Sequence, residues 1–283
     1  MNEVQLATCH CIISHPSKPK FMMIRHENGW LPPVVRFPAR GFVGDRAQMI
    51  ADGVLNKYGL KVTLLRHLVE TVEQHYVELE WQSDRVRKKL DAVWVGSREY
   101  DENRKSSPGE DDPLADWLAA AELKSFPPLR PAWERPGWFR KAADWIAHEL
   151  DRNHLQIQGE VRQVRACWPA YASLRVAAGG DRYLFRAAYG APPNESALIA
   201  FLAQERPRLV AGPLAFDAER NWLLTRDLAE DGAALPSPDD CPAIVRSFAE
   251  FQIACAADTA PLEALGMPTG GLDRLSDFLA AFS

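Results

Sequence analysis

Several kinds of segment are missing from this chain of 283 residues. No apolar run approaches the roughly 20 residues that a membrane-spanning helix requires, and the start of the chain lacks the basic and apolar regions of a signal peptide. The net charge of -5 leaves no excess of basic residues with which to neutralise the phosphates of a nucleic acid. The five cysteines are odd in number and scattered, which argues against a disulfide framework. We therefore expect a cytoplasmic protein without membrane or nucleic-acid partners.

The residues that are present, 47% hydrophobic and 25% charged, are typical of a globular protein, and the length suffices for two domains. The stretch 126–137 is rich in proline, which removes N–H donors and fixes φ, so it is expected to be a linker. Apolar residues at helical spacing predict an amphipathic helix over 137–152, whose aromatic face is expected to dock the two domains together. The predicted parts are a first domain (1–126), a linker with its docking helix (127–158) and a second domain (159–283).

The first domain combines strands with a central helix. Asp45 with Gln48 resembles a capping box, apolar residues then repeat at helical spacing, and Gly59 predicts the end of the helix. The segment Cys9-His10-Cys11 could bind zinc, but no second ligand pair follows, so two buried thiols in a strand are favoured. The polar stretch 99–113 is expected to be a surface loop. Strands are expected over 5–14, 20–25, 61–69, 76–81 and 91–96, with a short helix over 114–123, which gives an α+β fold in α/β/α layers.

Five motifs stand out in the first domain. They are Trp30-Leu31-Pro32, Phe37-Pro38-Ala39-Arg40-Gly41-Phe42, Lys57-Tyr58-Gly59-Leu60 at the end of the helix, Ala92-Val93-Trp94-Val95, and Asp116-Trp117-Leu118 with Ala121-Glu122-Leu123. Together they resemble the Nudix family. The resemblance implies an α/β/α sandwich in which glutamates on the helix of the Nudix box hold divalent cations, and these cations activate water against a pyrophosphate.

The paired glutamates of the Nudix box are replaced in this chain. Aligning the box on Gly59 and Leu60 places Asn56 and Lys57 at the positions of the metal-binding pair, and Gly53 falls where the box has another glutamate. A divalent cation needs several oxygen ligands and Lys57 would repel it, so we expect no metal site and no hydrolysis. The expected role is a scaffold, or recognition of a ligand without chemistry. The alternative is a Nudix hydrolase of a nucleoside diphosphate derivative that uses unconventional carboxylates, although strand glutamates at such spacings more often form a solvated face; the candidates are Glu70, Glu73, Glu78 and Glu80.

The second domain has the order of three strands, a helix and two strands. The strands are expected over 161–168, 173–176, 182–188, 209–216 and 222–225, with a hairpin turn at Ala178-Gly179-Gly180-Asp181 and a helix from an Asn194 cap to Gln204. This order is similar to the aminoglycoside phosphotransferase family, as are the segments Tyr183-Leu184-Phe185-Arg186-Ala187, Asn194-Glu195, Arg206-Pro207 and Asn221-Trp222-Leu223-Leu224-Thr225-Arg226-Asp227-Leu228. The resemblance implies a kinase-like small lobe, an antiparallel five-stranded sheet plus a helix, followed by the first helices of the large lobe.

The resemblance also implies a nucleotide site. In the family a lysine on the third strand holds the nucleotide phosphates and pairs with a glutamate on the next helix, and these positions are Arg186 and Glu195 here. Asp227 and Leu228 fall at the hinge that offers backbone groups to the adenine. Arginine is not a conservative replacement for this lysine, so a purely structural ion pair and a surface turn remain open alternatives. ATP and Mg are expected in a full-length parent, a small-molecule phosphotransferase, and none is expected to bind this chain tightly.

Histidine is absent after His154, so no segment beyond the small lobe can begin the His-x-Asp catalytic loop of a kinase. We therefore expect the chain alone to be inactive, as a non-catalytic fusion or a fragment of the parent. Two more helices are predicted after the hinge. The first, over 243–255, is expected to bury Ile244, Val245, Phe248 and Phe251; the second presents Leu272, Leu275, Leu279 and Phe282 on one face, which predicts self-association through this C-terminal helix.

Overall fold

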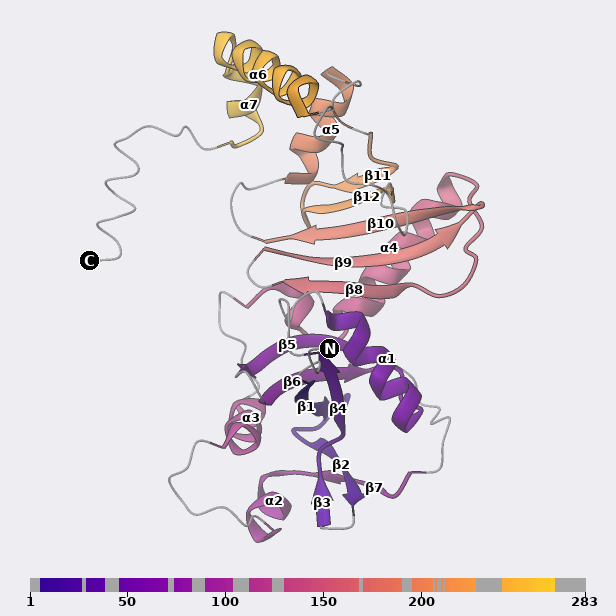
Figure 1. Cartoon of the computed structure of the whole chain (residues 1–283), viewed down its shortest axis with the longest axis vertical. Helices are drawn as coiled ribbons and strands as arrows, with labels where there is room; N and C mark the ends of the chain where they lie inside the picture. Colours follow the sequence, from indigo (N-terminus) through magenta and orange to yellow (C-terminus); the bar gives the residue numbers. More distant parts are fainter. Residues whose placement is uncertain are drawn as a thin grey trace, which may run out of the picture. The chain divides into compact units, whose positions relative to one another are not determined.

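The structure, a computed structural model, folds into two compact units of mixed α+β composition (Figure 1). Unit 1 comprises Met1–His148 and Glu160–Arg175, and unit 2 comprises Glu149–Gly159 and Val176–Ser283. The predicted α+β class is confirmed by two sheets, of seven and five strands. None of the helices that the structure describes has the length and apolarity needed to cross a membrane. The described residues are 6–26, 29–38, 46–70, 74–82, 90–103, 112–123, 130–167, 170–189, 195–205, 207, 210, 212–227 and 241–267.

The seven-stranded sheet is the centre of unit 1. Its main path runs β3-β2-β1-β6-β5, with β4 paired to β1 and β7 paired to β2. The contact between β1 and β6 is parallel, and the other pairs are antiparallel. All five strands expected from the sequence are present, whereas β3 and β4 were not predicted. The strands are β1 (Leu6–Ser14), β2 (Phe21–His26), β3 (Gly29–Leu31), β4 (Val34–Pro38), β5 (Val62–Glu70), β6 (Gln74–Trp81) and β7 (Ala92–Val95).

The alternation of side chains along β1 separates two hydrophobic cores. Cys9 and Cys11 lie with Ile13 in the core that includes the first helix, whereas Ile12 belongs to the core on the other face. The prediction of buried thiols is confirmed: both side chains are fully buried. A hydrogen bond with Cys9, together with burial, raises the pKa of Cys11, which keeps this thiol protonated and unsuited to binding metal.

Helix α1 (Ala47–Tyr58) covers the first of these cores. Ile50, Val54 and Tyr58 are buried on its inner face, as the helical spacing of apolar residues predicted. Gly59 ends the helix in the left-handed conformation (φ 70°), and its N–H donates to the carbonyl of Leu55 at 2.8 Å. The N-cap in the structure is Arg46, without a side-chain capping bond, and Asp45 lies outside the described residues.

Helices α2 (Ser97–Asn103) and α3 (Pro113–Glu122) cover the opposite face of the sheet. The prediction of a surface loop over 99–113 is wrong for its first part, because α2 buries Tyr100 against Phe21. The Tyr100 hydroxyl donates to the carboxylate of Asp112 at 3.0 Å, and Asp112 caps α3 by accepting from the backbone N–H of Leu114. The Ser97 hydroxyl of α2 also donates to the Glu122 carboxylate of α3 at 2.6 Å. These tertiary hydrogen bonds tie the two helices together, and the polarity of the segment alone does not predict them.

Strand β8 (Arg162–Cys167) belongs to unit 1 through one side chain in particular. The amide of Gln163 accepts from the backbone N–H of Leu64 at 2.7 Å and donates to the Leu64 carbonyl at 2.9 Å. Gln163 is 5% exposed, and the register of β5 shifts between Leu64 and Arg66 beside it. The glutamine thus satisfies two main-chain groups of β5 as a neighbouring strand would.

The five-stranded sheet has the order β11-β12-β10-β9-β8. The hairpin between β9 and β10 turns at Gly179 and Gly180, both at positive φ (58° and 89°), as predicted from their glycines. The predicted order of three strands, a helix and two strands is present, but the strand expected over 209–216 is described only at its end, as β11. The remaining elements are a 3-10 helix (Ala132–Glu134), α4 (Trp138–Arg152), β9 (Tyr171–Ala178), β10 (Asp181–Ala188), α5 (Glu195–Glu205), β11 (Ala215–Asp217), β12 (Trp222–Arg226), α6 (Cys241–Ala257) and α7 (Ala260–Ala264).

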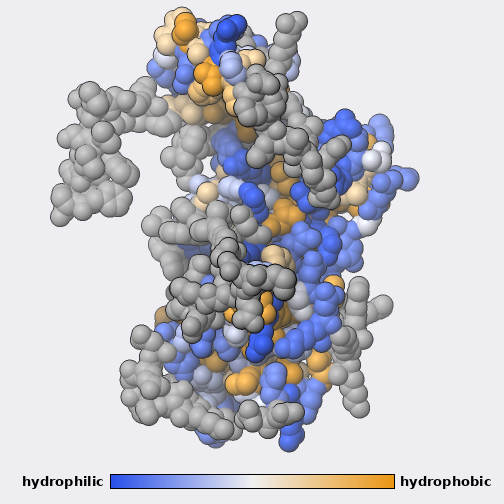
Figure 2. Space-filling view, in the orientation of Figure 1, coloured by the Kyte–Doolittle hydropathy of each residue, from blue (hydrophilic) through white to orange (hydrophobic). Residues whose placement is uncertain are grey.

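Helix α6 confirms the predicted helix but not its predicted burial. Val245 is 65% exposed and Phe248 is 58% exposed, and Ile253 on the same helix is 72% exposed. Figure 2 shows apolar surface in the region of α6. Phe251 is half-buried, and the side chain of Ile244 lies outside the described residues. The helical stripe from Leu272 to Phe282 also lies outside them.

The Gln163 amide gives a test of how β8 stabilises unit 1. Gln163→Leu would leave the N–H and C=O of Leu64 buried without partners, which is expected to cost about 2–4 kcal/mol of unfolding free energy. Gln156→Leu, at an exposed position, serves as the matched control and should change stability by less than about 0.5 kcal/mol. Urea denaturation measures both. Equal stability of the two variants would show that the Gln163 hydrogen bonds contribute nothing net.

A buried histidine gives unit 1 a pH-dependent stability. Burial, with the positive charges of His75 and Arg46, lowers the pKa of His67 to about 4, below the 6.5 of an unfolded chain. Protonating His67 therefore favours the unfolded chain. The free energy of unfolding is unaffected by His67 above pH 6.5 and decreases by up to roughly 3 kcal/mol as the pH falls from 6.5 towards 4. His67→Gln should flatten this part of the pH profile, whereas His148→Gln on the exposed side of α4 should not. Thermal unfolding between pH 4 and 8 measures the difference; parallel profiles for wild type and His67→Gln would contradict it.

Candidate functional site

A pocket of about 580 Å³ lies between β4 and α1 in unit 1. We call it the β4–α1 pocket. Its floor is apolar and comes from Leu31, Val34 and Val35. Gly53 and Lys57, one helical turn apart on α1, form the opposite wall. These two residues occupy positions at which the Nudix box has glutamates, so the pocket is where that resemblance places its metal centre.

The close approach of α1 to β4 depends on Gly53 and Tyr58. A Cβ at Gly53 would meet Val35 Cγ1 at 3.3 Å, so the absence of a side chain lets the helix lie against the strand. The Tyr58 hydroxyl accepts from the backbone N–H of Val34 at 2.8 Å and donates to its carbonyl at 2.9 Å. Both features fix the distance between the walls of the pocket.

The polar groups around the β4–α1 pocket are basic. Lys57 Nζ donates to the Val34 carbonyl at 2.8 Å and lies 5.1 Å from the centre of the Tyr58 ring. Arg36 projects from β4, and His26 from the end of β2. The Nε2 of His26 is buried and has no hydrogen-bond partner among the described residues. The described lining contains no carboxylate, so its electrostatic potential favours an anion.

The residues at the box positions do not fit a divalent cation. Gly53 has no side chain, Lys57 is a cation, and neither offers the oxygen ligands that Mg²⁺ requires. Within the described parts of the chain, no group of three or more His, Cys, Asp or Glu side chains could hold a metal ion.

The alternative carboxylates are engaged elsewhere. The prediction of a solvated face is wrong for Glu78, which is 5% exposed and bonded by Arg66 at 2.6 Å and Arg130 at 3.3 Å. Glu80 accepts from the backbone N–H of Gly137 at 2.6 Å, and burial raises its pKa. The side chain of Glu70 and all of Glu73 lie outside the described residues. Glu78 and Glu80 are thus both engaged by groups within unit 1.

The second predicted site is partly assembled in unit 2. Arg186 on β10 and Glu195 on α5 form an ion pair, with Nη1 and Oε1 3.1 Å apart, as the kinase resemblance anticipated. Both side chains are about a third exposed (38% and 28%). The backbone N–H of Asp227 donates to the Arg182 carbonyl at 2.8 Å, so this donor already bonds to the first residue after Asp181 in β10. Leu228 lies outside the described residues. A nucleotide role for these four residues stays a prediction.

The position of α5 depends on a residue that the sequence analysis did not single out. Asn221, at positive φ (54°), accepts from the backbone N–H of Ser196 at 3.0 Å, and the Ser196 hydroxyl bonds the Asp217 carbonyl at 3.3 Å. These bonds attach the first turn of α5 to the turn between β11 and β12. Asn194, which was expected to cap the helix, lies outside the described residues. The local signal for Asn221 is its place in a turn, where asparagine tolerates the left-handed conformation.

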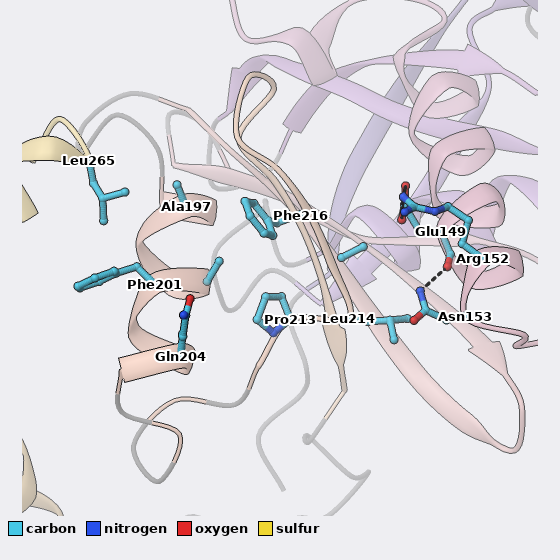
Figure 3. Close-up of a pocket in the computed structure, with 12 residues that line it drawn as sticks. Glu149, Arg152, Asn153, Ala197, Phe201, Gln204, Pro213, Leu214, Phe216 and Leu265 are labelled. Carbon is cyan, nitrogen blue, oxygen red and sulfur yellow. Dashed lines mark hydrogen bonds and ion pairs between the residues drawn. The ribbon is translucent and has the colours of Figure 1, made fainter. Parts of the chain in front are cut away.

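A second pocket, of about 760 Å³, was not foreseen from the sequence. Figure 3 shows Ala197, Phe201 and Gln204 of α5 on one side and Phe216 of β11 facing them. Glu149 and Arg152, from the end of α4, form an ion pair of 3.1 Å at its edge. No sequence motif predicts this pocket, because its lining comes from four segments that are separated in the sequence.

Comparisons with known proteins add little to this geometry. No model of a known protein family matches the chain, and no curated protein sequence matches it. Part of the chain is similar to a solved structure from a structure and function analysis of MutT from the fish pathogen Aliivibrio salmonicida and from Vibrio cholerae. The sequence identity is 17% and the TM-score 0.30, and the match covers 41% of this chain and 97% of the other. A match this weak and partial carries no argument about the site.

The chemistry of the β4–α1 pocket predicts how the protein responds to magnesium. Because Asn56 and Lys57 stand at the paired glutamate positions, millimolar Mg²⁺ should not raise the melting temperature, and nucleoside diphosphate derivatives should not be hydrolysed. Thermal shift, calorimetry and a phosphate-release assay test this. The double variant Asn56→Glu with Lys57→Glu is the matched control and should gain Mg²⁺ binding. Turnover by the wild type that a single carboxylate substitution abolishes would refute the prediction.

Proposed function

We propose that unit 1 is a Nudix-like domain that recognises a phosphorylated small molecule without hydrolysing it. The observation that carries the proposal is Lys57, whose ammonium group lies at the wall of the β4–α1 pocket where the family resemblance places a metal-binding glutamate. A lysine is a compact positive charge and a common phosphate binder. It attracts a phosphate directly, without the bound cation that a carboxylate would need as an intermediary.

The same replacement explains why chemistry is not expected. In metal-dependent hydrolysis the cation lowers the pKa of a bound water and so generates the nucleophile. An ammonium group supplies charge but binds no water as a Lewis acid does. The described lining residues also offer no carboxylate that could act as a general base near Lys57. Lys57 can therefore attract a phosphate, but it cannot generate the water nucleophile that hydrolysis needs.

The shape of the pocket favours a ligand with an apolar part as well as an anionic one. Leu31, which is 45% exposed, and Val34 form an apolar surface beside the charges of Arg36 and Lys57. A volume of about 580 Å³ lies within the range of small-molecule sites. Nucleoside diphosphate derivatives combine a planar base with a charged diphosphate and fit both features.

A second candidate function rests on the ion pair between Arg186 and Glu195. We propose that the region from residue 159 onward is similar to the small lobe of an aminoglycoside phosphotransferase, and that the parent activity is ATP-dependent transfer of phosphate to a small molecule. The 3.1 Å contact is the support, because kinases require the equivalent charged pair to hold the nucleotide. A small lobe encloses one side of a nucleotide only, so affinity for ATP should be on the order of millimolar or weaker.

Calorimetry with the full chain tests the anion proposal. In EDTA, inorganic pyrophosphate and ADP should bind with dissociation constants on the order of 0.1–1 mM. Lys57→Gln keeps a side-chain N–H donor for the Val34 carbonyl but removes the charge, so it should weaken binding about 5- to 10-fold. Lys141→Gln, at an exposed position of α4 outside the pocket, is the matched control and should leave affinity unchanged.

The outcomes separate the two sites. If Lys57→Gln and Lys141→Gln lost the same affinity, the loss would reflect the net charge of the protein, and binding in the β4–α1 pocket would be contradicted. Nucleotide binding that Arg186→Ala abolishes and Lys57→Gln leaves intact would assign the ligand to the kinase-like pair instead. Binding of pyrophosphate only in the presence of Mg²⁺ would overturn metal-independent recognition.

A further inference from the structure

The pocket on α5 is a groove with apolar side chains on its α5 and β11 walls and polar side chains at its edge on α4, where Glu149, Arg152 and Asn153 line it. We call it the α5–β11 groove. Ala197, Ala200 and Phe201 of α5 form one wall, Leu214 and Phe216 lie across from them, and Leu265, just after α7, lines one end (Figure 3). Phe216 is 48% exposed and Phe201 is half-buried, so apolar surface of the groove is accessible in the described part of the chain.

The dimensions of the groove suit a helix. Its α5 wall consists of residues 197, 200, 201 and 204, which is one face of a helix over two turns, about 10 Å long. The small side chains of Ala197 and Ala200 permit another backbone to approach closely. A hydrophobic groove of this kind is typically filled by an amphipathic helix that inserts side chains at positions i, i+3 and i+7.

We propose that the α5–β11 groove is the docking site for the chain's own segment Leu272–Phe282. The segment follows closely, along the chain, a residue that already lines the groove. Leu265 already lies at the groove, and Met267 is the last residue that the structure describes. Six residues lie between Leu265 and Leu272, and the seven steps along the chain span at most about 24 Å, which is ample to bring the segment back along the groove.

The apolar residues of the segment recur at helical spacing. Leu272, Leu275, Leu279 and Phe282 recur at i, i+3, i+7 and i+10, which places them on one side of a helix about 16 Å long. Asp273 and Asp277 fall on the other side. The apolar side matches the apolar groove, and the acidic side would remain in water.

The segment Leu272–Phe282 is also covalently joined to the groove through the residues that follow Leu265. A short flexible connection gives the attached segment an effective concentration in the millimolar range. Contacts too weak to hold a separate peptide therefore suffice to hold this one. The exposed residues Val245, Phe248 and Ile253 of α6 offer a second apolar surface, but α6 presents them on a convex helix, whereas the groove encloses an inserted side chain on two sides.

Hydrogen–deuterium exchange of the full chain tests the docking. The wild type should protect amides of both Leu272–Phe282 and α5. The double variant Leu275→Asp with Leu279→Asp should exchange at least about tenfold faster in both regions, because a charge in the apolar interface disfavours the docked state. Ala281→Asp introduces the same charge on the opposite side of the segment and should leave both patterns unchanged.

A groove variant provides the reciprocal measurement. Ala200→Glu places a charge on the α5 wall and should release the segment, with the same acceleration at 272–282. Should this variant fail to fold, the segment variants still decide, since they change no residue of the described fold. Exchange of the wild-type segment at unfolded rates would overturn the proposal. So would acceleration confined to α6, or protection that depends on protein concentration, which would indicate a second copy as the partner.

Discussion

The packing of α1 on the sheet of unit 1 is the contact on which the rest of that unit depends. Its inner face contributes Ile50 and Val54 to the core that also holds Cys9 and Cys11. The bonds between Tyr58 and Val34 then fix the helix against β4 at its C-terminal end. Since positions 53 and 57 follow from this placement, the geometry of the β4–α1 pocket is a consequence of core packing.

The charged side chains buried in unit 1 have different partners from those that line the β4–α1 pocket. Glu78 is buried between Arg66 and Arg130, and Arg130 also lies 3.8 Å from the Glu134 carboxylate. Burial raises the pKa of Glu134, yet two arginines nearby favour its ionised form. These buried charges are compensated by one another. At the pocket the charged residues of the described lining are basic, and Lys57 bonds to the Val34 carbonyl.

Periodicity predicted most elements of the fold, and tertiary contacts account for the errors. Five of the seven strands in the larger sheet, and helices α1, α3, α4 and α5, follow from alternation and helical spacing, whereas the short strands β3 and β4 were missed. Helix α2 was missed because its segment is polar, whereas the hydrogen bonds of Tyr100 with Asp112 and of Ser97 with Glu122 show why it is ordered. The paired Arg186 and Glu195 could be anticipated from a resemblance. The groove on α5 could not, because no local pattern says which distant segments will enclose a hollow.

The bonds between Gln163 and Leu64 have a consequence for how the chain is made. They join residues 99 positions apart, and β8 enters unit 1 only after the chain has passed through Glu149–Gly159, which belongs to unit 2. The two units are therefore interleaved along the polypeptide. During synthesis the N–H and C=O of Leu64 therefore gain their Gln163 partner only after residue 163 has left the ribosome, and unit 1 is complete only with residue 175. Domains usually fold as units in order of emergence, and here that order is broken by a single returning strand.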